Sequence, residues 1–410
     1  MGDLHPSAFQ PILPGATLGV LGGGQLGRMF AQAAQRLGYA TVVLDPEADS
    51  PAGHISHRHL QAAYLDAQGL AQLAACADAI TTEFENVPAA ALRTLAERRP
   101  VAPTAEMVAL AQDRAVEKEH FARCGVACGP WARIDDTAQL DAVIEARPEL
   151  FPGILKTARL GYDGKGQAQV ANAAALARAW NDLGGVPCVL EKKLPLAFEL
   201  SIVLARGRDG QIVQFPAQRN LHRNGILAVT EVYEGNVPES LEAAAVSAAV
   251  SIANQMQYVG VLCVEFFVLE DAADAGRGQP LRLVANEMAP RPHNSAHYTI
   301  DACSVSQFDL QVRALAGLPL VSPRLHSPAV MLNLLGELWL QQGGTPRWPD
   351  VLALPGTHLH LYGKALPSQG RKMGHLTITG ATIEAARAVA LEAARLLGIE
   401  PFPKPEFGAS

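Results

Sequence analysis

Residues 281–295 read Leu281-Arg282-Leu283-Val284-Ala285-Asn286-Glu287-Met288-Ala289-Pro290-Arg291-Pro292-His293-Asn294-Ser295, a strand-like apolar run that leads into a dense polar stretch. Glu287 stands at the end of this apolar run, and Glu265 lies inside a second one, residues 261–267. A carboxylate in a buried strand costs several kcal/mol unless a cation compensates for its charge. Two such carboxylates on neighbouring strands suit Mg²⁺, a hard ion that binds carboxylate and phosphate oxygens. The sequence therefore predicts a metal site at Glu265 and Glu287, next to donors in residues 291–295 for a small anion.

The length and composition indicate a folded chain of several domains. A chain of 410 residues is too long for one ordinary core, so two or three domains are expected. A hydrophobic content of 49% and a charged content of 18% are typical of a well-packed soluble protein. The formal net charge of −7 argues against a nucleic-acid binder held by a general basic surface. We therefore predict no nucleic-acid partner, while a local phosphate site stays compatible.

The cysteines and the apolar runs bear on location. The six cysteines are scattered, and no second Cys or His pair follows Cys124 and Cys128 at the spacing of a zinc site. They are expected to be free thiols in a reducing compartment. No segment approaches the roughly 20 uninterrupted apolar residues of a membrane span, and the first dozen residues do not resemble a signal peptide. We expect a cytoplasmic protein with no membrane partner.

The first hundred residues alternate strand-like and helix-like patterns. Strands are predicted at 17–22, 40–44 and 77–82, and helices at 26–37 and 89–97, which indicates a parallel doubly wound sheet. Gly22-Gly23-Gly24-Gln25-Leu26-Gly27 joins the first strand to the first helix and matches the dinucleotide fingerprint, with Asp45 ending the next strand. Glycines there let a phosphate approach free N–H groups. A phosphate site for another ligand is favoured, with a nicotinamide or flavin site and plain packing as alternatives.

The rest of the chain divides into a central and a C-terminal part. A helix without strands around 104–112 suggests a crossing between domains, so the predicted domains are 1–112, 113–310 and 311–410. The central part is expected to hold strands at 154–156, 188–191, 199–205 and 226–232 and a helix at 240–257. The C-terminal part is expected to be a small α/β domain with strands at 329–335, 358–362 and 375–379 and a helix at 382–397.

Residues 160–167 form a second glycine loop, Leu160-Gly161-Tyr162-Asp163-Gly164-Lys165-Gly166-Gln167, after Lys156 at a strand end. Its N–H groups could close over a polyphosphate whose charge Lys156 and Lys165 neutralise. The spacing is not that of a Walker A loop, which ends in Gly-Lys-Ser/Thr. An ordinary glycine-rich hairpin is the alternative.

Other charged residues are individually ambiguous. Residues 189–194 look like a strand that runs out into a linker, and the linker backbone and Glu199 could receive a nucleobase and a ribose or be a solvated charge cluster. Arg114 and Lys118 could meet a nucleotide or merely balance Asp113 and Glu117. His222 could be a ligand contact or a turn residue. Near the C-terminus, Lys364, Arg371 and Lys372 could bind a phosphate monoester or belong to an exposed basic hairpin.

Six motifs, in this order, resemble the ATP-grasp superfamily and, within it, the 5-(carboxyamino)imidazole ribonucleotide synthase family. They are Gly24-Gln25-Leu26-Gly27-Arg28-Met29, Glu83-Phe84-Glu85-Asn86-Val87, Gln112-Asp113-Arg114, the loop 161–167, Pro290-Arg291-Pro292-His293-Asn294-Ser295 and Gly370-Arg371-Lys372-Met373-Gly374-His375. The resemblance spans residues 18–375 and implies an ATP-grasp fold, with an N-terminal Rossmann-like preATP-grasp domain and a small C-terminal domain. It also implies an ATP-dependent ligase of purine biosynthesis. Such an enzyme carboxylates aminoimidazole ribonucleotide with bicarbonate through carboxyphosphate and works as a homodimer. Functional coupling to a downstream mutase as a further partner is left open by the resemblance.

The resemblance also implies a role for each matching residue. Glu265 and Glu287 would hold Mg²⁺, Arg291, His293 and Asn294 would hold bicarbonate, and the rest would bind ATP or the ribonucleotide. The ATP set is Arg114, Lys156, Gly161, Tyr162, Asp163, Gly164, Lys165, Gly166, Gln167, Glu191, Lys192, Lys193, Leu194, Glu199, His222, Asn286 and Glu287. The ribonucleotide set is Gln25, Glu85, Tyr162, Asp163, Lys165, Lys364, Arg371 and Lys372.

Three positions depart from the family pattern, and other classes of protein stay open. Leu160 replaces a glycine, which should stiffen the start of the loop; Pro292 replaces a valine and removes a backbone N–H; and Ala296 replaces a glycine. The nearest alternative is another ATP-grasp ligase, such as formate-dependent glycinamide ribonucleotide transformylase or a biotin carboxylase. Only the first glycine turn suggests a dehydrogenase. A non-catalytic nucleotide-binding regulator would not need all the charged groups that are present.

Overall fold

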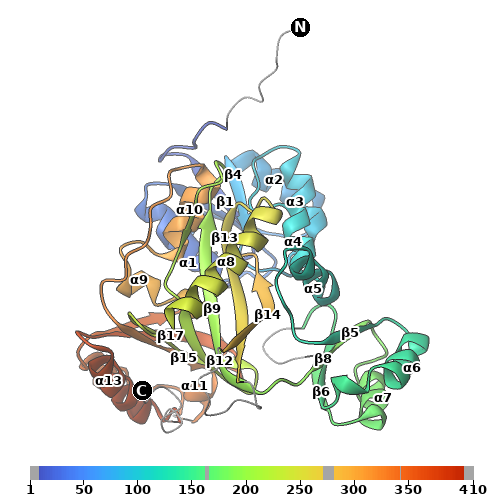
Figure 1. The fold of residues 1–410 in the computed structure, drawn as a ribbon. Helices are drawn as coiled ribbons and strands as arrows, with labels where there is room; N and C mark the ends of the chain where they lie inside the picture. The colour runs from blue at the N-terminus through green and yellow to red at the C-terminus, as the bar shows by residue number, and fades with distance from the viewer. Residues whose placement is uncertain (1–8, 162–165, 271–280, 342, 401–410) are drawn as a thin grey trace.

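The computed structural model describes residues 9–161, 166–270, 281–341 and 343–400, and its N-terminal part is a parallel sheet (Figure 1). The strand order is β3-β2-β1-β4, and every pair is parallel. Alternate residues of β1 pack on the two faces, Leu18 and Val20 against α1 and Leu21 against α2 and α3. The predicted doubly wound sheet is confirmed. Its elements are β1 (Thr17–Leu21), α1 (Gln25–Arg36), β2 (Ala40–Asp45), β3 (Arg58–Gln61), α2 (Ala67–Cys76), β4 (Ala79–Thr82) and α3 (Ala89–Ala96).

A small lobe follows two connecting helices, α4 (Ala105–Ala111) and α5 (Arg114–Arg123). Its antiparallel sheet has the order β5-β8-β6-β7, and helices α6 and α7 cover it. Leu155, Leu190 and Trp180 belong to a core of its own. The elements are β5 (Trp131–Ile134), α6 (Thr137–Ala146), η1 (Pro148–Leu150), β6 (Gly153–Thr157), β7 (Gln167–Val170), α7 (Ala173–Asp182) and β8 (Cys188–Lys192).

The largest sheet is antiparallel and positions the two acids predicted from the sequence. Its order is β14-β13-β9-β11-β12-β15-β17-β16, with β10 paired to β9. On β13, Leu262, Val264 and Phe266 pack under α8, so the intervening Glu265 lies on the opposite face. The central elements are β9 (Leu196–Arg206), β10 (Ile212–Gln214), β11 (Gln218–Arg223), β12 (Ile226–Val232), α8 (Glu239–Gln255), β13 (Gly260–Leu269), β14 (Arg282–Ala289), η2 (Asn294–Ala296), α9 (Thr299–Ala302) and α10 (Gln307–Ala316).

The C-terminal strands continue this same sheet, because β15 pairs with β12. Helix α13 packs on β15 and β17, and α10 joins the sheet to the N-terminal part by packing its Phe308 and Val312 in one core with Phe30 of α1 (Figure 1). The C-terminal elements are β15 (Ala329–Leu335), α11 (Glu337–Gln341), α12 (Trp348–Leu352), β16 (Thr357–Leu361), β17 (Lys372–Thr379) and α13 (Ile383–Leu397). Among the described residues, no helix has the length and apolar character needed to cross a membrane.

Candidate active site

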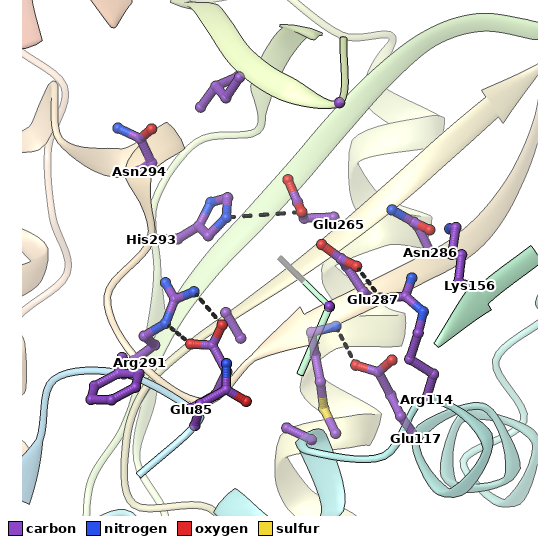
Figure 2. Close-up of a pocket in the computed structure, with 18 of the residues that line it drawn as sticks. Glu85, Arg114, Glu117, Lys156, Glu265, Asn286, Glu287, Arg291, His293 and Asn294 are labelled. Atoms are coloured by element: carbon purple, nitrogen blue, oxygen red, sulfur yellow. Dashed lines mark hydrogen bonds and ion pairs between the residues drawn. The ribbon is translucent and has the colours of Figure 1, made fainter. Parts of the chain in front are cut away.

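A cavity of about 890 Å³ lies where the N-terminal part, the small lobe and the large sheet meet. It gathers residues that are far apart in the sequence, and Figure 2 shows its centre, with side chains from β13, β14 and α5 turned toward one another. The predicted site residues that line it are Gln25, Glu85, Arg114, Lys156, Gly161, Gly166, Gln167, Glu199, His222, Glu265, Asn286, Glu287, Arg291, His293, Asn294 and Lys372.

Glu265 and Glu287 face each other directly across the β13–β14 pair. Burial and the neighbouring Glu287 raise the pKa of Glu265. Burial also opposes the ionisation of Glu287, but Arg114, whose Nη1 lies 2.9 Å from Glu287 Oε2, and Lys156 outweigh it and lower the pKa of that carboxyl. The two acids therefore share negative charge unequally, as carboxylates in contact must.

The residues around this pair fit a magnesium ion. Glu265 Oε1 and Asn286 Oδ1 are both buried without a hydrogen-bond partner among the described residues. Buried polar atoms are normally paired, and oxygen atoms of carboxylate and amide groups are the ligands that Mg²⁺ accepts. The unpaired oxygens beside two opposed carboxylates are the feature that a bound divalent cation would complete.

Glu191 is the centre of a cluster of cations next to the acid pair. Its carboxylate oxygens lie 2.9 Å from Lys156 Nζ, 3.3 Å from Lys118 Nζ and 3.5 Å from Arg114 Nε. Burial alone would raise the pKa of Glu191, but Lys156, Lys118 and Arg114 lower it well below the ordinary range. Three cations shared between Glu191 and Glu287 leave an excess of positive charge where phosphates would lie.

Arg291 forms a two-point ion pair with Glu85. Its Nη2 donates to Glu85 Oε1 at 3.0 Å and its Nε donates to the other carboxylate oxygen. Burial opposes the charge on each partner, but the ion pair lowers the pKa of Glu85 and raises that of Arg291. Arg291, predicted to bind bicarbonate, and Glu85, predicted to bind the ribonucleotide, are thus paired with each other (Figure 2).

His293 and Asn294 present polar atoms to the same space. Burial, followed by the charge of Arg291, lowers the pKa of His293 well below its usual value, so the ring is neutral. Gln307 holds its backbone at both ends, accepting from His293 N and donating to His293 O, each at 2.8 Å. Asn333 donates to Asn294 Oδ1, and Asn294 Nδ2 is buried without a partner among the described residues. An anion would complete the hydrogen bonds of that amide.

Glu199 and His222 form a second polar wall of the cavity on strands β9 and β11. His222 Nδ1 lies 3.0 Å from Glu199 Oε2. Burial disfavours a charged imidazole there, but Glu199 raises the pKa of His222. The prediction that both residues belong to the nucleotide site stays a prediction, now with both side chains placed on one cavity.

The first glycine turn is already occupied by the protein's own carboxylates. Glu83 accepts from Gly24 N at 2.7 Å and from Gly27 N at 3.0 Å, and Asp45 accepts from Gly23 N at 2.7 Å. A Cβ on Gly24 would lie only 2.3 Å from a Glu83 oxygen. These three amides therefore donate to other groups of the protein and are not open to a ligand. Gln25, in the same turn, lines the cavity.

Some predicted residues are not brought to the cavity wall as far as the described residues define it. Lys192 Nζ donates to Glu149 O at 2.6 Å and Lys193 Nζ to Gln169 Oε1 at 3.1 Å. Arg371 donates to Leu366 O at 2.6 Å. The full set that is not on the wall is Glu191, Lys192, Lys193, Leu194, Lys364 and Arg371. The predicted residues Tyr162, Asp163, Gly164 and Lys165 lie outside the described residues.

The sequence analysis left out or left open several residues that shape the site. Glu117 accepts from Met288 N at 2.7 Å, and burial raises its pKa to about 8 although Arg114 opposes this. The spacing of Arg114, Glu117 and Lys118 on one helix was a usable signal. Gln307 and Asn333 gave no such signal, because each contacts the site from a distant part of the chain.

Comparisons with known proteins agree with this architecture. A model described as the ATP-grasp domain matches residues 119–308, the ribonucleotide synthetase preATP-grasp domain matches 15–112, and the phosphoribosylaminoimidazole carboxylase C-terminal domain matches 329–389. The fold and the site thus define an ATP-grasp ligase. The N5-carboxyaminoimidazole ribonucleotide synthase of Brucella melitensis is 42% identical, with 89% of this chain and 96% of that protein covered. The chain belongs to the N5-carboxyaminoimidazole ribonucleotide synthase family.

Two crystal structures extend the comparison to three dimensions. The N5-carboxyaminoimidazole synthetase of Staphylococcus aureus, complexed with ADP, has a TM-score of 0.84 and 38% identity and covers 94% of this chain and 98% of its own. The synthase of Aspergillus clavatus, in complex with ADP and 5-aminoimidazole ribonucleotide, has a TM-score of 0.82 and 29% identity. It covers 93% of this chain and 98% of its own. The family resemblance found in the sequence is confirmed.

Proposed function

We propose that this protein carboxylates 5-aminoimidazole ribonucleotide with bicarbonate at the expense of ATP. The products are 5-(carboxyamino)imidazole ribonucleotide, ADP and phosphate, in the purine pathway that leads to IMP. The observation that carries the proposal is one cavity that joins paired acids and clustered cations to the buried anion donors Arg291, His293 and Asn294. A site that only bound a nucleotide would need the first group without the second.

The nucleotide half of the cavity would hold ATP by charge. Arg114 and Lys156 would contact the phosphates, Glu199 the ribose, and residues 191–194 the adenine, with His222 and Asn286 completing the contacts. The loop 161–167, which contributes Gly161, Gly166 and Gln167 to the wall, would cover the phosphates. Glu265 and Glu287 would hold Mg²⁺, which when bound neutralises phosphate charge during transfer.

The acceptor half would hold bicarbonate and the ribonucleotide. Bicarbonate bound to Arg291, His293 and Asn294 would attack the γ-phosphorus, giving ADP and carboxyphosphate. That intermediate, or CO₂ released from it, would then react with the exocyclic amine of the ribonucleotide. Enclosure matters because water destroys carboxyphosphate.

The ribonucleotide itself would lie between the N-terminal and C-terminal parts. Gln25 and Lys372 line the cavity from these two sides, and Glu85 reaches it through its pair with Arg291. Lys364 is close enough to Glu83, at the first glycine turn, to influence its charge. These positions support a phosphate site there, with Arg371 at its margin and Tyr162, Asp163 and Lys165 from the glycine loop.

The same proposal includes a cytoplasmic homodimer that is functionally coupled to the downstream mutase. The family resemblance supports these points, and the six cysteines, all free thiols, fit a reducing compartment. Light scattering on the purified protein tests the dimer.

The decisive experiment is ADP release from MgATP and ¹³C-bicarbonate, with and without aminoimidazole ribonucleotide. Strong stimulation by the ribonucleotide, with the label in a carboxylate of the product, is expected. ADP release that ignores the ribonucleotide would refute the proposed acceptor. Stimulation by glycinamide ribonucleotide and formate instead would favour the transformylase reaction, which the relatives do not favour.

A further inference from the structure

The imidazole ring of His293 has one nitrogen toward the protein and one toward the cavity. Nδ1 lies 2.9 Å from Ser295 Oγ and 3.3 Å from Ser295 N. Nε2 faces the acid pair, 3.8 Å from Glu265 Oε2 (Figure 2). Which nitrogen carries the proton of a neutral ring is decided by the hydrogen bonds that the other nitrogen makes.

The contacts of Nδ1 require it to be an acceptor. The backbone N–H of Ser295 can only donate, so it needs a lone pair on Nδ1. The Ser295 hydroxyl reaches the same nitrogen and has one proton to give. A ring that accepts at Nδ1 carries its proton on Nε2.

A chain of buried hydrogen bonds leads from the Ser295 hydroxyl through Ser201 and Asn220 to Thr230. Ser201 Oγ lies 2.8 Å from Ser295 Oγ, Asn220 Nδ2 donates to Ser201 Oγ at 2.9 Å, and Thr230 Oγ1 donates to Asn220 Oδ1 at 2.9 Å. Ser201 and Ser295 are 0% exposed and Asn220 is 3% exposed, so water does not substitute for any link. Gln218 Oε1 is a second acceptor for the Ser201 hydroxyl, at the longer distance of 3.1 Å.

The direction of this chain depends on where Ser201 donates its one proton. Ser201 Oγ accepts a hydrogen bond from Asn220 Nδ2, so its one proton can be donated either to Ser295 Oγ at 2.8 Å or to Gln218 Oε1 at 3.1 Å. The shorter contact favours Ser295, whose own proton is then donated to His293 Nδ1. Buried networks of this kind hold one arrangement because an unmade bond is costly there.

We infer that Ser295, through Ser201 and Asn220, holds His293 in the tautomer with the proton on Nε2, so that His293 meets the anion in the cavity as a hydrogen-bond donor and not as a base. Ser295 is thus a positioning residue. The identity of the anion rests on the proposed function, whereas the tautomer does not. While Nε2 carries its proton, the ring cannot accept one from bicarbonate at that atom.

The test is ¹⁵N NMR of the full-length protein with labelled histidine, in which protonated and unprotonated ring nitrogens are resolved. The His293 signals are assigned by their loss in His293→Gln. In the wild type we expect the proton on Nε2. Ser295→Ala keeps the longer backbone N–H contact to Nδ1 at 3.3 Å but loses the hydroxyl contact at 2.9 Å, so we expect part of the population to change to the Nδ1–H form. We also expect the KM for bicarbonate to rise about tenfold, the loss of one hydrogen bond, while the KM for ATP stays within about twofold.

Matched variants separate this role from general loss of structure. Ser251→Ala removes another serine hydroxyl of the central part, which donates to Cys124 O at 2.9 Å, and should change neither the tautomer nor the KM for bicarbonate. Ser295→Cys keeps a weak donor and should restore part of the Nε2–H form. Ser201→Ala, one link further away, serves if Ser295→Ala does not fold.

The outcomes are distinct. A proton on Nδ1 in the wild type, or an unchanged tautomer in both Ser295→Ala and Ser201→Ala, overturns the inference. A wild type with the proton on Nε2 but without ribonucleotide-stimulated ADP release would overturn the proposed function and leave the tautomer assignment standing.

Discussion

Two strand ends in this protein look like binding motifs, and only one leaves its polar groups open. At residues 22–27 the amides of Gly23, Gly24 and Gly27 are bonded to Asp45 and Glu83. At residues 286–294 buried polar atoms have no partner among the described residues; with Glu265 Oε1 nearby, they are Asn286 Oδ1 and Asn294 Nδ2. Because buried polar groups are normally satisfied, the open set marks where ligands complete the bonding. A motif therefore indicates a site only when the protein has not already filled it.

The filled turn explains why the dinucleotide pattern misleads. A pyrophosphate would have to displace Glu83 from two amides and would meet its negative charge. Asp45, in the position of a ribose-binding acid, accepts from Gly23 N and from Tyr64 Oη, each at 2.7 Å, and so fixes the turn. The same glycines serve packing, and Gln25 of this turn lines the cavity.

The largest expected effect comes from breaking the open site at Glu287. Glu287→Gln keeps the side-chain volume but removes the charge that faces Arg114 and that would bind Mg²⁺. We expect ADP formation to fall about 10²–10³-fold, as when a charge-stabilising group is removed from a site, with an unchanged far-UV spectrum. Glu234→Gln, an exposed acid, is the matched control. Near-normal ADP formation in Glu287→Gln would remove Glu287 from the metal site.

The second prediction breaks the filled turn. Glu83→Ala leaves the amides of Gly24 and Gly27 without their acceptor, and each unsatisfied buried group costs about 1–3 kcal/mol. We expect the free energy of unfolding in urea to drop by about 2–4 kcal/mol. Glu83→Gln, which keeps one acceptor oxygen, should lose less. Equal stability of Glu83→Ala and the wild type would show that these bonds do not hold the turn.

The third prediction concerns pH at the floor of the open site. Burial raises the pKa of Glu117 to about 8 from an ordinary 4.5, so between these values the folded protein binds a proton that the unfolded chain lacks. Stability should then fall as pH rises through this window, by at most about 1.4 kcal/mol per pH unit. Glu117→Gln cannot ionise, so its unfolding free energy should lack this fall. Urea unfolding at several pH values compares the two, and parallel pH profiles would contradict the shift.

The fold could be predicted from the sequence where hydrophobic periodicity is strong. The strands around Val20, Val43 and Val264 and the helices at 26–37 and 240–257 were identified within one or two residues. In the small lobe, β5, β7, α6 and α7 were not, because short half-exposed elements carry little periodic signal. The pairing of β12 with β15 was also invisible, since it joins residues about a hundred positions apart and depends on tertiary packing.

The site could be predicted wherever a charged residue sits in an apolar run. Glu265 and Glu287 stand out for this reason, and the structure places them opposite each other. Glu191 was predicted at the end of a strand, where it lies, but its contacts with three cations were not predicted. Partners such as Ser201 look like ordinary core residues in the sequence, because nothing local shows that a distant residue completes their hydrogen bonds.

The basic hairpin places two neighbouring cations differently. Lys372 lines the cavity, whereas the neighbouring Arg371 donates to Leu366 O outside its wall. Lys372→Ala should raise the KM for the ribonucleotide about tenfold, the value of one charge-assisted bond, and Arg371→Ala should raise it less. Initial rates with varied ribonucleotide measure both. A larger rise of this KM in Arg371→Ala than in Lys372→Ala would indicate that Arg371 binds the phosphate of the ribonucleotide.

The smallest effect is expected at the start of the glycine loop, where Leu160 replaces the glycine of the family pattern. Leu160 is 74% exposed and has a φ of 61°, a left-handed conformation that costs a residue with a Cβ about 1–2 kcal/mol. Leu160→Gly removes this cost but makes the unfolded chain more flexible by about 0.5–1 kcal/mol, so a gain in unfolding free energy of at most about 1.5 kcal/mol should remain. Leu160→Ala keeps the Cβ and should not gain. If Leu160→Gly were less stable than Leu160→Ala, as in an ordinary helix or strand, Leu160 would not be strained. The stiffness expected for this loop would then need another origin.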